Sequence, residues 1–132
     1  MNPNFYNPAN AGKWSYDPNL RTLVEAAPDY RKSAGIKAAA TDRKRVALLL
    51  IDVQRDFCIP PEFDANGVQM SGGTLYVGSR SGTGAIDDSR RIAEFIYREM
   101  GSLTSIIPTM DTHMAFQIFT PSFWIDQDGH TL

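Results

Sequence analysis

The sequence lacks several features that membrane, secreted and nucleic-acid-binding proteins need. Its single cysteine, Cys58, excludes an intramolecular disulfide and suits a reducing compartment. No apolar run reaches the ~18 residues of a membrane helix, and the first residues have neither the basic nor the apolar region of a secretion signal. With 13 Lys and Arg against 15 Asp and Glu, the chain also lacks the basic excess of a nucleic-acid binder. We therefore expect a cytoplasmic protein with neither a membrane nor a nucleic acid as partner.

Composition divides the 132 residues into an extended N-terminal arm, 1–44, and a domain-like part, 45–132. Residues 1–18 are rich in Asn, Pro and Tyr and have almost no aliphatic side chains, so they cannot build a core of their own. Residues 20–27 predict a short helix that Pro28 stops. We interpret the arm as a surface segment that lies over a neighbouring core or a partner subunit, with a disordered tail as the alternative.

The strongest structural signal is the apolar run that begins at Val46 and ends at Ile51. It does not alternate, so both faces must be covered, and its length and branched residues favour a central parallel strand over 46–53. Residues 54–84 show no periodicity and contain many Gly and Pro residues. A loop of roughly thirty residues is unusual in a compact domain and indicates a functional reason.

A helix and a second strand complete the pattern. Apolar residues recur at helical spacing over 85–100, with Thr83 or Gly84 as the N-terminal cap and Gly101 as the stop. Residues 103–110 predict a strand that Pro108 weakens. Strand, helix and strand form a right-handed parallel βαβ unit. Two strands cannot cover so apolar a first strand, so we expect a fold that needs more strands than this sequence supplies.

Three polar residues are candidates for chemistry. Asp52 directly follows the apolar run, at the strand end where open α/β sheets bind ligands, and a desolvated carboxylate there suits a general base. The alternative is an Asp that caps the next turn. Asp111 and His113 follow the second strand with the spacing for one divalent metal, which needs a further ligand. The alternative is a polar pair that satisfies loop backbone.

Other conspicuous residues favour structural roles. Cys58 lies early in a Pro-rich loop with no helix start after it, so we interpret it as a packed thiol and not a nucleophile. The Gly-Gly pair at 72–73 and the glycines of 78–84 match no phosphate-binding motif and indicate turns. The aromatic residues of 116–124 are typical of a core or an interface.

Three motifs together resemble the nicotinamidase/isochorismatase-like cysteine hydrolases. They are Leu-Leu-Leu-Ile-Asp-Val-Gln-Arg-Asp-Phe-Cys at 48–58, Gly-Gly-Thr-Leu at 72–75 and Thr-Met-Asp-Thr-His at 109–113. The resemblance covers roughly 45–113. It implies a three-layer α/β/α, Rossmann-like parallel sheet, of which this chain supplies a part.

The family resemblance also implies chemistry. Members hydrolyse small carboxamides, such as nicotinamide to nicotinate and ammonia in pyridine nucleotide metabolism, through an Asp–Lys–Cys triad. Asp52 matches the triad Asp, Phe57 matches a residue of the substrate ring pocket, and Asp111 with His113 matches a pair that binds zinc, iron or manganese. No organic cofactor is implied.

The family's Lys and Cys come after the Asp-x-His pair, and the residues after His113 contain neither. A third metal-ligating histidine, a few residues further on in relatives, is replaced here by Phe119 and Thr120, which leaves His130 as the alternative ligand to consider. We therefore expect the N-terminal half of such an enzyme, inactive alone, that acts on a small amide as a homo-oligomer or with a complementing C-terminal half. The alternatives are a non-catalytic interaction subunit that completes its sheet with a partner, and a metal-free isochorismatase-type hydrolase.

Overall fold

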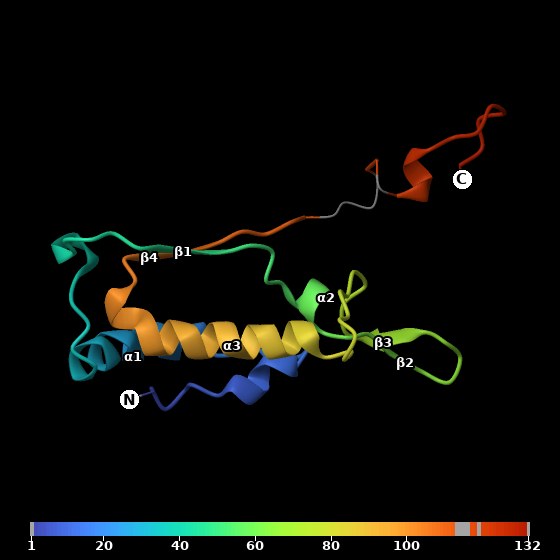
Figure 1. Cartoon of the computed structure of the whole chain (residues 1–132). Helices are drawn as coiled ribbons and strands as arrows, with labels where there is room; N and C mark the ends of the chain where they lie inside the picture. Colours follow the sequence, from blue (N-terminus) through green and yellow to red (C-terminus); the bar gives the residue numbers. More distant parts are fainter. Residues whose placement is uncertain (1, 113–116, 119, 132) are drawn as a thin grey trace.

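The chain forms a mixed α/β structure with a two-stranded parallel sheet, β1–β4, and a two-stranded antiparallel sheet, β2–β3 (Figure 1). The computed structural model describes residues 2–112, 117–118 and 120–131. In chain order the elements are η1 (Pro8–Gly12), α1 (Leu20–Ser33), η2 (Ala39–Thr41), β1 (Ala47–Leu50), α2 (Arg55–Cys58), β2 (Glu62–Phe63), β3 (Gln69–Ser71), α3 (Gly84–Glu99), η3 (Met100–Ser102), β4 (Ser105–Pro108) and η4 (Pro121–Phe123), where η marks a 3₁₀ helix. None of the described helices is long and apolar enough to cross a membrane.

The parallel pair of strands is confirmed. β1 and β4 run in the same direction, with Ala47 opposite Ser105 and Leu50 opposite Pro108, and α3 lies between them in the chain. Both strands are shorter than the sequence predicts. Pro108 is tolerated because the backbone nitrogens of neighbouring residues in a strand point to opposite edges. The Thr109 N–H donates to Leu50 O (2.8 Å), so the ring nitrogen of Pro108 faces the unpaired outer edge.

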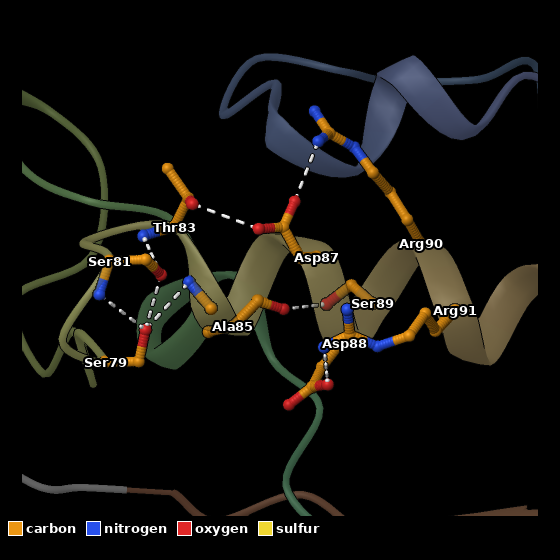
Figure 2. A network of polar contacts seen from close by, with 10 residues as sticks. Ser79, Ser81, Thr83, Ala85, Asp87, Asp88, Ser89, Arg90 and Arg91 are labelled. Atoms are coloured by element: carbon orange, nitrogen blue, oxygen red, sulfur yellow. Dashed lines mark hydrogen bonds and ion pairs between the residues drawn. The ribbon is translucent and has the colours of Figure 1, made fainter.

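The helix predicted over 85–100 is present as α3, and polar contacts organise its start (Figure 2). The Thr83 hydroxyl donates to Asp87 (3.0 Å), which also forms an ion pair with Arg90 (3.0 Å). The Gly84 N–H donates to the Ser79 hydroxyl (3.2 Å). Gly101 follows the C-cap residue Met100, where the sequence predicts the stop, but its φ is not positive and the chain tightens into η3.

The region 54–84 is more structured than its lack of periodicity suggests, so the expectation of a plain loop is wrong. It contains α2 and the antiparallel β2–β3 hairpin. The Asp64 carboxylate accepts from the backbone N–H groups of Asn66 and Val68 (both 2.8 Å), and Gly67 has a φ of 79°. These turn contacts hold β2 and β3 together, although both strands are too short to show an alternating pattern of apolar and polar residues.

The N-terminal segment packs against α3 on the side away from the sheet (Figure 1). The rings of Tyr6 and Tyr97 are 4.7 Å apart, and Tyr30 of α1 also contacts Tyr97. The predicted stop at Pro28 is wrong, since α1 continues to Ser33. Proline removes only one backbone hydrogen bond of the helix. At the N-terminal end of α1, the Thr22 N–H donates to Asn19 Oδ1 (3.1 Å), and this cap stabilises the helix.

The apolar core of the described residues is small. Ile59 and Ile86 are its buried aliphatic side chains, at 5% and 8% exposure. Leu49 and Ile107 are register partners on the sheet face away from α3, and they are 53% and 48% exposed. This face is therefore largely uncovered by the described residues, and both outer edges of the sheet lack a described neighbouring strand.

Candidate active site

Asp52 lies where the sequence predicts it, just past the carboxyl end of β1. Its backbone has a φ of 53°, which turns the chain away from the strand direction. Thr109, just past β4, makes two contacts with this one residue. The Asp52 N–H donates to Thr109 Oγ1 (3.1 Å), and the Thr109 hydroxyl donates to Asp52 Oδ1 (2.8 Å). The two parallel strands therefore fix the orientation of the half-buried carboxylate.

A second link joins the same two strand ends. The side-chain amide of Gln54 donates to Asp111 O (2.9 Å), while Gln54 Oε1 accepts from the Asp111 N–H (2.7 Å). This pair of bonds resembles one step of a β ladder and extends the connection between the strands beyond β4. Asp52 and the backbone of Asp111 are thus held at one end of the sheet, as the sequence predicts.

Phe57 is positioned by α2 and by the segment that follows the hairpin. The Asp56 carboxylate accepts from the N–H and the hydroxyl of Thr74 (2.9 and 3.1 Å), and the Val77 N–H donates to Phe57 O (2.9 Å). The backbone of Gly73 lies so close to α2 that a Cβ atom added to it would be 1.8 Å from Asp56 O. The Gly-Gly pair therefore allows close backbone contact, as the interpretation of turns suggests.

These elements enclose an open cleft of about 1190 Å³ between β1, α2, α3 and residues 75–81. Asp52, Phe57 and Cys58 all line it. The other walls are mainly aliphatic and aromatic, with side chains such as Leu48, Leu75, Ile92 and Phe95. A largely apolar cleft with a few polar groups at the end of a parallel strand is a typical small-molecule site.

The charge in the cleft is mostly negative. Asp52, Asp87 and Asp88 contribute carboxylates, and Arg91 is the one cation among the described lining residues. Arg91 forms an ion pair with Asp88, and this hydrogen bond raises the pKa of Arg91 above its ordinary value. The charges of this pair cancel, and Asp87 is paired with Arg90, so the remaining charge of the lining side chains is that of Asp52, which disfavours an anionic ligand.

The described residues do not supply a complete metal centre. They contain no group of three or more His, Cys, Asp and Glu side chains that could hold an ion. Asp111 is exposed, and His113 lies outside the described residues. His130, considered as a substitute ligand, has its Nδ1 3.5 Å from Asp126 of its own turn.

Sequence reasoning found Asp52 and Phe57 but missed the residues that hold them. Thr109 and Gln54 both lie within the quoted motifs, yet nothing in their spacing shows that they bond across the two strand ends. Cys58 is the last residue of α2 and is half-buried at the cleft wall. The short helix that carries it was also missed.

No family model, curated protein or solved structure matches the chain. The motifs quoted above and the geometry of the cleft are therefore the basis for any functional proposal.

Proposed function

We propose that this chain is the N-terminal part of a nicotinamidase-like cysteine hydrolase with a three-layer α/β/α fold, and that the parent enzyme converts a small carboxamide to its acid and ammonia. The observation that carries the proposal is the placement of Asp52. It follows a parallel strand, it is oriented by Thr109, and it lines a cleft together with Phe57.

In the proposed reaction Asp52 accepts the proton of the catalytic thiol. The Thr109 hydroxyl occupies Oδ1, and among the described residues no donor reaches Oδ2, so Oδ2 is the oxygen that accepts it. The thiolate then attacks the amide carbonyl, the protonated Asp52 returns its proton to the nitrogen so that ammonia leaves, and water hydrolyses the thioester to the acid. The triad Lys and Cys are not in this sequence, because no lysine follows Lys44 and the half-buried Cys58 precedes the second strand.

In this proposal, Asp111 and His113 are the residues of the chain that would bind a divalent metal. Zinc, iron or manganese would polarise the substrate when bound. The described residues do not fit a complete centre, since they contain no group of three or more His, Cys, Asp and Glu side chains that could hold an ion. We therefore assign no step of the hydrolysis to a metal.

The cleft favours a neutral amide over the doubly charged substrate of an isochorismatase-type enzyme. Asp52 would repel a dicarboxylate, because Arg91 is already paired with Asp88 and Asp87 is paired with Arg90. Phe57 offers a ring surface for a planar aromatic amide. This arrangement supports the nicotinamidase-type assignment over the metal-free isochorismatase type.

Titration of the chain with nicotinamide tests the proposal. We expect weak binding, with a dissociation constant on the order of 1 mM, and no displacement of nicotinamide by the dianion isophthalate. Phe57→Ala removes a cleft wall and should weaken nicotinamide binding at least about fivefold. Phe123→Ala, a matched change in η4 outside the cleft, should leave it unchanged. Equal effects of the two variants, or displacement of nicotinamide by isophthalate, contradict the proposal.

A catalytic test uses the same chain. Without the triad Lys and Cys we expect no release of ammonia from nicotinamide above the uncatalysed rate. Turnover that is abolished by Asp52→Ala would show that the chain is active by itself and would overturn this part of the proposal.

The second candidate function is a non-catalytic subunit that completes its sheet with a partner. The exposed Leu49, Ile51 and Ile107 and the unpaired strand edges favour it. Light scattering separates the candidates, because a compact monomer counts against an interaction subunit.

A further inference from the structure

A second cleft, of about 360 Å³, lies between the N-terminal segment and the helices α2 and α3. Arg55 joins its two sides, because its guanidinium donates to Trp14 O (3.0 Å) and to Tyr16 O. η1 contacts α3 beside it, and Arg90 extends toward the N-terminal segment (Figure 2). Val53 and Cys58 line both clefts, whereas Asp52 lines the first cleft only.

Aromatic rings form much of the wall of the second cleft. Tyr6, Tyr16 and Tyr97 line it, and the rings of Tyr6 and Tyr97 meet at 60°. Tyrosine rings offer flat apolar surface together with a hydroxyl group, so they suit a planar ligand that carries a polar substituent. The volume is sufficient for one small ring compound.

The charge of this cleft is opposite to that of the first. Lys13 and Arg55 line it, and no Asp or Glu is present among its described lining residues. The Lys13 ammonium donates to Asn10 Oδ1 (2.9 Å), and Arg55 donates to backbone carbonyls. Within the part of the chain that the structure describes, neither cation forms an ion pair with a carboxylate, so their positive charge is not neutralised.

We propose that the second cleft binds a small aromatic carboxylate. The ring lies against Tyr6, Tyr16 and Tyr97, and the carboxylate accepts from Lys13 and from the guanidinium N–H groups that Arg55 does not use for Trp14 and Tyr16. Hydrogen bonds between two charged groups are stronger than those between neutral ones, so the carboxylate and not the ring sets the selectivity.

Calorimetric titration of the whole chain with benzoate and with its uncharged counterpart benzamide tests this inference. We expect benzoate to bind at least about tenfold more tightly than benzamide, because only benzoate neutralises the cations. Lys13→Gln keeps a group that can donate to Asn10 but removes the charge, and should weaken benzoate binding about fivefold. Lys37→Gln, an exposed cation outside the cleft, is the matched control and should leave binding within about twofold.

Asp52→Asn tests which cleft binds benzoate. Asp52 lines the first cleft and not the second, so this variant should have the same benzoate affinity as the unaltered chain. The inference is overturned if benzoate does not bind, if benzamide displaces benzoate with equal affinity, or if Lys13→Gln has no more effect than Lys37→Gln. A large change in benzoate affinity in Asp52→Asn would place the ligand in the first cleft and would also overturn it. None of these outcomes depends on whether the parent enzyme hydrolyses an amide.

Discussion

Among the residues that the structure describes, Asp52 is the one non-glycine residue with a positive φ. This conformation costs about 1 kcal/mol for a residue with a side chain. Aspartate tolerates it better than most residues do because its short side chain forms local hydrogen bonds. Here the bonds come from Thr109, on the neighbouring strand. The strain and the oriented carboxylate therefore have one structural origin.

Thr109→Val tests this origin, because it keeps the shape of the side chain and removes the hydroxyl. We expect a loss of about 1–2 kcal/mol in the free energy of unfolding, since two hydrogen bonds to Asp52 disappear. Denaturant titration measures the loss, and Thr112→Val at an exposed position is the control. Equal stability of the two variants would show that Thr109 does not hold Asp52.

Gly73→Ala tests the close contact beside Phe57. The new Cβ would lie 1.8 Å from Asp56 O, so backbone must move, and we expect a destabilisation of about 2–3 kcal/mol. Gly101→Ala is the matched control, because nothing lies within 4 Å of its Cβ position. Thermal unfolding compares the two, and a Gly73→Ala protein as stable as Gly101→Ala would contradict the turn geometry.

At the scale of elements, the sequence predicts the long pieces and misses the short ones. The apolar run and the helical spacing identify β1 and α3, since burial imposes a period on many residues. β2 and β3 have too few residues for a period, and α2 is a single turn. Their formation depends on particular contacts, such as the bond of Thr74 to Asp56, that spacing does not reveal.

The turn of the β2–β3 hairpin gives a prediction for pH. Backbone N–H groups of Val68 and Asn66 bond to Asp64 and hold its pKa below the ordinary 3.8. The bonds stabilise the hairpin fully above pH 3.8, and this contribution is lost as the pH falls through the lowered pKa of the folded state. Amide chemical shifts of Asn66 and Val68 should therefore change only at acid pH, and Asp64→Ala should abolish the change. A titration step near neutral pH would contradict this.

At the scale of the whole molecule, the chain has a sheet whose face away from α3 is largely uncovered by the described residues. The position of the candidate site could be predicted from sequence because the carboxyl ends of parallel strands meet at one edge of the sheet. The hydrogen bonds of Thr109 and Gln54, and the exposure of apolar side chains on the outer face of the sheet, could not be predicted. Leu49 is 53% exposed although it lies in the most apolar segment. Sequence shows that a residue is apolar, and only the fold shows what covers it.

This exposed face predicts concentration-dependent self-association. We expect light scattering to give a mass above that of the 14.7 kDa chain at high concentration. Leu49→Gln together with Ile107→Gln should shift the distribution toward the monomer. Val24→Gln in α1, where the side chain is 71% exposed, is the control. A monomer at all concentrations would show that the outer face does not drive association.

The most direct test of the central claim is a measurement of nuclear Overhauser effects between nicotinamide ring protons and the isotope-labelled chain. If Asp52 and Phe57 define a carboxamide site, cross-peaks connect the ligand to the Phe57 ring and to Leu75, which line the same cleft. Cross-peaks to Tyr6 and Tyr97 of the second cleft, with none to Phe57, would contradict the account.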